Sequence, residues 1–213
     1  MAARRRIDPA AGAQALGVAF VEVAGLAGQR FVMGRDMRTS GPELSAAFAE
    51  GAAQAGAAVL DIGLASTDQL WFASGQLGLP GVQFTASHNP ARYNGIKFCR
   101  SQAQPVTPDF LVDLATVAQG YDAAGLPAPV GSVPISRQDL LGDYARYLHS
   151  LVPLDQIRRL RVVVDAGNGM AGHTAPAVLG SLNVDLVGLF LELDGNFPHQ
   201  QPNPLEPQNL VDA

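Results

Sequence analysis

The sequence has little of what disulfide-bonded, zinc-binding and membrane proteins need. Its 213 residues include a single cysteine, Cys99, which excludes an internal disulfide and a multi-cysteine zinc site and fits a reducing, cytoplasmic setting. No unbroken apolar stretch reaches the ~18 residues of a membrane-spanning helix, because the longest run of small apolar residues, 10–27, is interrupted by Gln14 and Glu22. The basic start of the chain leads into Ile7-Asp8-Pro9, so no signal peptide is predicted.

Charge is also scarce, and the little there is has a negative excess. Charged residues make up 15% of the chain and the net charge is −5, whereas about 25% charged residues is typical of a globular domain. The acidic balance argues against partners such as nucleic acid or an anionic membrane, because few phosphates could be neutralised. The low total predicts sheets covered on both faces, or surfaces that contact more protein.

Lysine is nearly absent. Of the 14 basic residues, 13 are arginine and one, Lys97, is lysine. Arginine stays protonated at every useful pH, whereas a desolvated lysine can give up its proton. Lys97 is therefore a candidate for proton transfer. A codon bias towards arginine, with one lysine left by chance, would give the same count.

The order of predicted elements indicates an α/β fold. Apolar residues with helical spacing alternate with short apolar runs typical of buried strands. Ser40 and Glu43, like Ser66 and Gln69, have the spacing of a capping box at a helix start. The expected order is helix 9–27, strand 29–36, helix 41–55, strand 57–63, helix 66–77 and strand 81–85. Such alternation predicts a mixed, mostly parallel sheet covered by helices.

A second, incomplete α/β domain is expected to follow. After a strand over 93–99 and a helix over 108–119, the glycine- and proline-rich stretch 120–134 has the character of a linker. The predicted domains are therefore 1–134 and 135–213. In the second we expect a helix over 136–151, a strand over 160–165, a helix over 171–182 and a strand over 184–191.

The clearest candidate site follows the strand that ends at residue 85. Thr85-Ala86-Ser87-His88-Asn89-Pro90 places a hydroxyl and an imidazole at the carboxyl end of a strand, where ligands bind in open α/β sheets. Ser and Asn are also ordinary turn formers, so a plain strand-to-loop exit is the alternative. A hydrolase triad fits less well, because the Gly-x-Ser-x-Gly elbow is missing. Adjacent side chains on an extended stretch would also point to opposite sides.

Phosphoryl transfer is the chemistry that this loop suits better. A phosphoryl group on Ser87 would carry about −1.5 to −2 charges and would need cations and donors nearby. Lys97, ten residues on, could supply a positive charge and move a proton to or from a sugar hydroxyl.

Other candidate motifs leave alternatives open. The sequence has neither a P-loop nor a Gly-x-Gly-x-x-Gly fingerprint, so nucleotide-binding predictions lose support. The turn Asp165-Ala166-Gly167-Asn168-Gly169 could hold an anion at a helix N-terminus or only close a strand onto its helix. Arg35 and Arg38 could contact phosphate, or Arg35 could pair with Asp36 and brace its loop. His149, His173 and His199 are scattered without metal-ligand spacing.

Taken together, the motifs resemble those of a known family. Residues 85–90 with Tyr93-Asn94-Gly95-Ile96-Lys97 resemble the phosphoserine loop of the α-D-phosphohexomutases, in particular the bacterial phosphomannomutase/phosphoglucomutase group. Residues 34–38, 165–169 and 202–210 are similar to the family's other early signatures. The resemblance covers nearly the whole chain.

The resemblance implies a site and a reaction. Phosphorylated Ser87 would donate its phosphoryl group to a hexose phosphate, and the bisphosphorylated sugar would return its other phosphate. Hexose 1,6-bisphosphate would act as activator. Mg²⁺ would bind through the phosphorylated Ser87, Lys97 would be the general acid/base, and His88 would lie beside the transferred group.

The sequence also departs from the family pattern. The family's opening Tyr-Asp-x-Arg-Gly segment, its Asp-Gly-Asp-x-Asp-Arg metal loop and its third and fourth domains have no counterpart here. The chain is therefore expected to need the missing domains of the same polypeptide as partners and to lack mutase activity alone. It is either a piece of a mutase, with a phosphoglucosamine mutase as the enzyme alternative, or a catalytically silent product that at most binds phosphate or protein.

Overall fold

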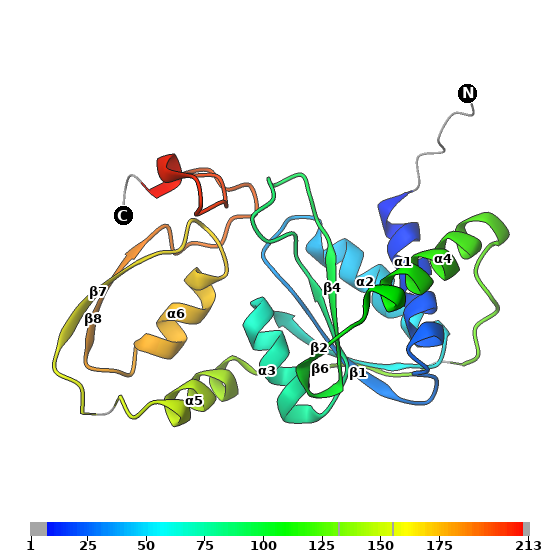
Figure 1. Cartoon of the computed structure of the whole chain (residues 1–213), viewed down its shortest axis with the longest axis horizontal. Helices are drawn as coiled ribbons and strands as arrows, with labels where there is room; N and C mark the ends of the chain where they lie inside the picture. The colour runs from blue at the N-terminus through cyan, green and yellow to red at the C-terminus, as the bar shows by residue number, and fades with distance from the viewer. Residues whose placement is uncertain (1–7, 132, 155, 211–213) are drawn as a thin grey trace.

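The computed structural model describes residues 8–131, 133–154 and 156–210 (Figure 1). The helices are α1 (Pro9–Val23), α2 (Gly41–Gln54), α3 (Thr67–Leu77), α4 (Pro108–Ala124), α5 (Leu141–Leu151) and α6 (Ala171–Leu179). The strands are β1 (Arg30–Arg35), β2 (Ala58–Leu64), β3 (Gly81–Phe84), β4 (Ile96–Arg100), β5 (Gln104–Pro105), β6 (Ile135–Arg137), β7 (Leu160–Asp165) and β8 (Val184–Leu189). Two 3₁₀ turns, η1 (Ser101–Ala103) and η2 (Pro207–Leu210), complete the fold.

The strands form two sheets, which define two units. The first unit, α1 to β6, has a six-stranded sheet in the order β5-β4-β3-β1-β2-β6. Within it β3, β1, β2 and β6 are parallel, β4 pairs antiparallel with β3, and β5 pairs antiparallel with β4. The second unit, α5 to η2, has the parallel pair β7-β8, which α6 connects. The predicted mixed, mostly parallel α/β fold is confirmed.

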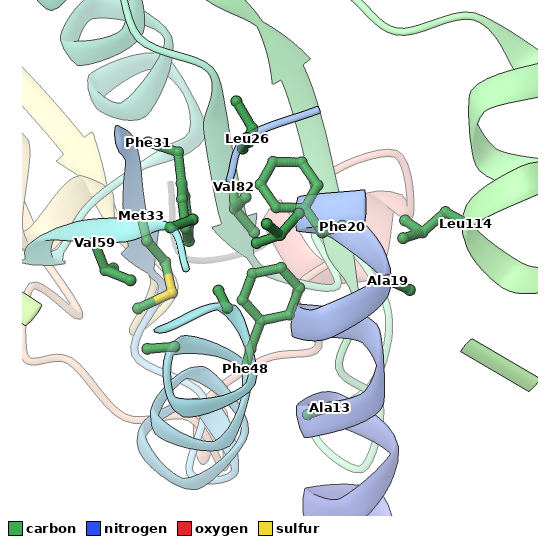
Figure 2. Close-up of a cluster of buried hydrophobic side chains, with 14 of the residues drawn as sticks. Ala13, Ala19, Phe20, Leu26, Phe31, Met33, Phe48, Val59, Val82 and Leu114 are labelled. Carbon is green, nitrogen blue, oxygen red and sulfur yellow. The ribbon is translucent and has the colours of Figure 1, made fainter. Parts of the chain in front are cut away.

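Two helical layers cover the first sheet. One face packs against α1, α2 and α4 around Phe20, Phe31 and Phe48, whose rings approach edge-on or tilted (Figure 2). The other face packs against α3 through Leu60 and Leu70. Burial on both faces explains the apolar strands and part of the low charge content.

The contact between α1 and α2 depends on two glycines. A Cβ on Gly17 would lie 2.1 Å from the carbonyl oxygen of Phe48, and a Cβ on Gly51 would lie 2.1 Å from that of Gln14. Both distances are far below van der Waals contact. The backbones can approach this closely only because each helix has no side chain at the crossing point.

Of the capping residues expected at helix starts, the structure confirms one and contradicts another. Ser66 caps α3 as expected, since its hydroxyl accepts a hydrogen bond from the Gln69 amide at 3.1 Å. The capping prediction for Ser40 is wrong: its side chain does not cap α2 but accepts a hydrogen bond from Asn94 Nδ2 at 2.9 Å. A partner 54 residues away in the sequence has replaced the local one.

The region after residue 134 also differs from the expectation. A helix was predicted from Ser136, but residues 135–137 form β6, which pairs with β2, and α5 begins at Leu141. The strand just beyond the predicted domain boundary is thus hydrogen-bonded to the first sheet; the boundary itself stays a prediction. Within the described ranges no helix is both long and apolar enough to cross a bilayer.

Candidate functional site

Loops from both units surround one cleft. The Arg38 loop (residues 36–40) follows β1, the Ser87 loop (85–95) joins β3 to β4, and the turn 166–170 follows β7. Together with the segment 194–209 they enclose about 330 Å³, and the Ser87 loop and the C-terminal segment lie at the same end of the molecule (Figure 1). The lining side chains include Asp36, Ser66, Gln83, Ser87, His88, Asp165, Phe197 and Gln200. This is the carboxyl end of parallel strands, where ligands are expected.

Ser87 occupies a special backbone position in this cleft. It is exposed, whereas Thr85 and Ala86 just before it are buried. Its φ of +51° lies in the left-handed region, which is uncommon for a residue with a Cβ. The Ser87 amide donates to Thr85 Oγ1 at 3.1 Å. Strained, well-supported backbone of this kind gathers at functional sites.

The turn corrects the expectation for His88. On an extended stretch the side chains of Ser87 and His88 would point to opposite sides, but residues 87 and 88 form a turn and both line the cleft. The structure therefore brings together the first two of the three predicted catalytic residues.

Lys97 lies in β4, directly opposite Gln83 of β3 in an antiparallel pair. Side chains of such a pair share one face of the sheet, and Gln83 lines the cleft. Lys97 itself is half-buried and does not belong to the described residues that form the cleft wall. It therefore shares the sheet face that borders the cleft.

The question left open for the two arginines is resolved in favour of Arg38. Its guanidinium, not that of Arg35, pairs with Asp36, with Nε 3.3 Å from Oδ2. The Arg38 side chain is 0% exposed, so it cannot contact a ligand in the cleft. Its terminal nitrogens instead bind carbonyl oxygens of the Ser87 loop.

Three amides of the turn after β7 already have hydrogen-bond partners. The amides of Gly167, Asn168 and Gly169 donate to Asp165 Oδ1, Phe190 O and Ala166 O at 2.8, 2.9 and 2.7 Å. With these donors in use, the turn closes β7 onto α6. The Asn168 side chain adds a contact to His199 Nδ1 at 2.8 Å.

The described residues do not by themselves fit a magnesium ion. Among them, no group of three or more His, Cys, Asp or Glu side chains could share a metal. The two carboxylates of the cleft are engaged, Asp36 by Arg38 and Asp165 by the Gly167 amide and Gln200. Mg²⁺ needs octahedral oxygen ligands, so the predicted ligand, Ser87, would supply only part of a site.

Some of the cleft wall was missed from the sequence. Phe197 and Gln200 line the cleft, but they lie in an irregular proline-containing segment with no periodicity to mark them. The nearby run 202–210 was singled out only through the family resemblance. The contacts that place these residues, such as Gln200 Nε2 to Asp165 at 3.2 Å, join positions far apart in the chain.

Comparison with known proteins agrees with this architecture. Residues 4–124 match the family model for phosphoglucomutase/phosphomannomutase alpha/beta/alpha domain I, and residues 143–213 match that for domain II. A Xanthomonas campestris protein described as "Phosphohexose mutases" is 40% identical over 181 residues, covering 84% of this chain and 40% of that protein. A Pseudomonas putida phosphomannomutase/phosphoglucomutase is 36% identical over 188 residues, covering 84% of this chain and 37% of that protein.

A solved structure gives the same result. The phosphoglucomutase/phosphomannomutase family protein of Burkholderia thailandensis superposes with a TM-score of 0.84 at 35% identity, covering 98% of this chain and 46% of that one. This chain thus spans less than half of the length of the relatives it matches. On its sequence, its fold and the two matched domains, it belongs to the phosphoglucomutase/phosphomannomutase family.

Proposed function

We propose that this chain carries the phosphorylated serine of a hexose-phosphate mutase, and that Ser87 is that serine. The observation that carries the proposal is the position of Ser87: exposed, in a left-handed turn at the carboxyl end of β3, and lining a cleft shared by both units. The names of the relatives support a phosphomannomutase or phosphoglucomutase activity for the whole protein.

The proposed reaction is a reversible phosphoryl transfer. The bond from phosphorus to Ser87 Oγ breaks, a bond from phosphorus to a sugar hydroxyl oxygen forms, and the hydroxyl proton leaves as Oγ takes up a proton. The bisphosphorylated sugar then returns its other phosphoryl group to Ser87, which completes the conversion between hexose 1-phosphate and hexose 6-phosphate. Such transfer depends chiefly on positioning and electrostatic stabilisation.

Lys97 and His88 are the proposed partners of Ser87. His88 lines the cleft beside Ser87, and Lys97 lies on the sheet face that borders it. We assign proton transfer to Lys97, because a lysine can work as an acid and a base whereas arginine cannot. His88 would donate hydrogen bonds to the transferred group.

Two further components stay proposals. Hexose 1,6-bisphosphate would load Ser87 with its phosphoryl group. Mg²⁺, which supplies charge neutralisation when bound, would take the seryl phosphate as one ligand and would need others from outside the described residues.

A cytoplasmic location is also proposed, on the single buried cysteine. A phosphoglucosamine mutase is the enzyme alternative; a silent fragment is the non-enzymatic one.

The test is phosphate mapping on the protein expressed from its complete reading frame. After incubation with glucose 1,6-bisphosphate and Mg²⁺, intact mass and peptide analysis should find one phosphoryl group, on Ser87. A Ser87→Ala variant is the matched control and should stay unmodified. Phosphate on Ser66, which also lines the cleft, or on Ser101, with Ser87 bare, would contradict the assignment.

A further inference from the structure

One fully buried cation lies directly behind the Ser87 loop. The Arg38 side chain is 0% exposed, and its two terminal nitrogens donate to four carbonyl oxygens of the loop at 2.7 to 3.0 Å: those of Ser87, Asn89, Pro90 and Tyr93. A guanidinium has five N–H donors in a rigid plane. Four of the five therefore bind backbone of a single loop.

The remaining nitrogen, Nε, makes an ion pair with Asp36 but no hydrogen bond within the described residues, and this pairing balances the buried charge. Arg38 Nε lies 3.3 Å from Asp36 Oδ2, and Asp36 Oδ1 accepts the Arg38 amide at 3.0 Å. Asp36 is held in turn by β3, because its own amide donates to Phe84 O at 2.9 Å. A buried charge is tolerated when it is paired and hydrogen-bonded. Removing the guanidinium would leave four carbonyl oxygens and a carboxylate without their partner.

The second unit reaches the same guanidinium. The ring of Phe197 lies 5.2 Å from Arg38 Cζ in cation–π geometry and is 5% exposed. Two residues earlier, Gly195 approaches the Arg38 loop so closely that a Cβ there would lie 2.8 Å from Arg38 Cα and from Met37 O. Arg38 is thus the point where the Ser87 loop and the second unit meet.

We propose that Arg38 is a positioning residue: it holds the Ser87 loop in its left-handed turn and makes the order of that loop depend on the seating of Phe197 from the second unit. Its relevance to catalysis rests on the proposed function of Ser87. Because the guanidinium is sealed off from the cleft, it acts on a ligand only through the backbone that it holds. The second unit would then influence the phosphorylated serine without touching it.

The geometry also says why lysine cannot replace this residue. An ammonium is a compact charge with three donors, whereas the four carbonyl oxygens are bound by a planar fork. Arg38→Lys keeps the charge next to Asp36 and loses the fork. It separates the positioning role from the charge.

The test is amide hydrogen exchange of this chain, read at two loop amides. The amides of Asn89 and Tyr93 donate inside the loop, to Ala86 O and Pro90 O. In Arg38→Lys their exchange should become roughly ten- to hundred-fold faster, as expected for loss of charge-assisted hydrogen bonds. Phe197→Leu, a change in the other unit, should accelerate the same amides to a lesser extent. Amides of β1 and β3 should keep their wild-type protection in both variants.

Arg35→Lys, at the last residue of β1 and three residues before Arg38, is the matched control and should leave the loop amides unchanged. Loop exchange unaltered in Arg38→Lys would overturn the positioning role. Equal acceleration in β1 and β3 would also overturn it, because Arg38 would then support overall stability only. Loop exchange unaltered in Phe197→Leu would overturn the dependence on the second unit.

Phosphate mapping of the wild type keeps this result separate from the proposed function. Absence of phosphate on Ser87 would contradict the proposed function, whereas the exchange rates decide the role of Arg38. Where wild-type Ser87 is phosphorylated, Arg38→Lys should lower kcat with KM little changed, because the substrate contacts stay in place. Wild-type kcat in Arg38→Lys would overturn the inference.

Discussion

The two units contain strands of similar composition whose side chains are buried to very different extents. Val32 of β1 is 0% exposed, whereas Val163 of β7 is 56% exposed. In the first unit helices cover both faces of a six-stranded sheet. Among the described residues of the second unit, the two strands of its sheet pack against α6. A run of β-branched residues thus predicts a strand. The number of helical layers that cover the strand decides how far its side chains are buried and how much they contribute to the free energy of unfolding.

The largest expected difference between the units is in catalysis, because the proposed reactive side chains all lie in the first unit. Lys97→Arg keeps the charge but cannot usefully give up its proton, so it should lower kcat by about 10²–10⁴-fold in the protein from the complete reading frame. A coupled assay with mannose 1-phosphate or glucose 1-phosphate measures it. His199→Asn, in the second unit, is the control and should cost far less. Near-wild-type kcat in Lys97→Arg would remove Lys97 from proton transfer.

Stability should follow the same division. Phe48 is 0% exposed and its ring contacts those of Phe20, Phe31, Phe84 and Phe98. Phe48→Ala should therefore cost about 3–5 kcal/mol of unfolding free energy. The same change at half-buried Phe190, which stacks on His199 at 4.2 Å, should cost about 1–3 kcal/mol, from part of the ring's burial and from the ring pair. Urea denaturation measures both, and equal losses would show that the units do not differ in energetic weight.

A smaller loss of stability is expected at the contact between the units, where Gly195 packs against the Arg38 loop. A Cβ on Gly195 would lie 2.8 Å from backbone of the Arg38 loop, so Gly195→Ala should cost about 1–3 kcal/mol through overpacking. The loss should appear with added exchange in the Ser87 loop. Gly75→Ala, where a Cβ meets nothing within 4 Å, is the control on an open helix surface. Wild-type stability in Gly195→Ala would mean that Gly195 is not closely packed against the Arg38 loop.

The smallest expected effect is a pH dependence where α5 meets α3. Burial, with a smaller contribution from Asp68, raises the pKa of Tyr144, whose ring lies 5.7 Å from that of Phe72. The unfolded chain then loses this proton first, so stability should be flat below about pH 10 and decline above it. Tyr144→Phe should flatten that decline in alkaline denaturation curves. An unchanged slope would exclude Tyr144 as its source.

What the sequence could predict was local. Alternating helical and strand patterns predicted the α/β fold, and the Ser66 cap is present because its partner amide lies within one turn. The Gln69 side chain, which would complete the predicted capping box, makes no hydrogen bond to any described residue. The capping prediction for Ser40 failed because Asn94 binds its hydroxyl. Strand β6 was missed because three residues carry no periodicity, and only the pairing with β2 makes them a strand.

The candidate site divides in the same way. Ser87 and His88 were predicted from their place after a strand, and their shared side of the cleft depends on a left-handed turn that no local pattern predicts. Arg38 could not be chosen over Arg35, because its carbonyl partners lie 49 to 55 residues further on. Residues with long-range partners are those that sequence reasoning left open.

The antiparallel strand β4 has a consequence for how the site folds. Because β4 returns beside β3, the Ser87 loop closes over residues 85–95, with the Thr85 amide bonded to Gly95 O at 2.9 Å. Hairpins of this size form in about 1–10 μs, whereas the Arg38 contacts close a much longer chain loop, which is slower. The loop should therefore form early but acquire its final geometry only once β1 and β3 have paired. Pulsed exchange during refolding should find the Thr85 amide, which donates to Gly95 O, protected before the Asn89 amide.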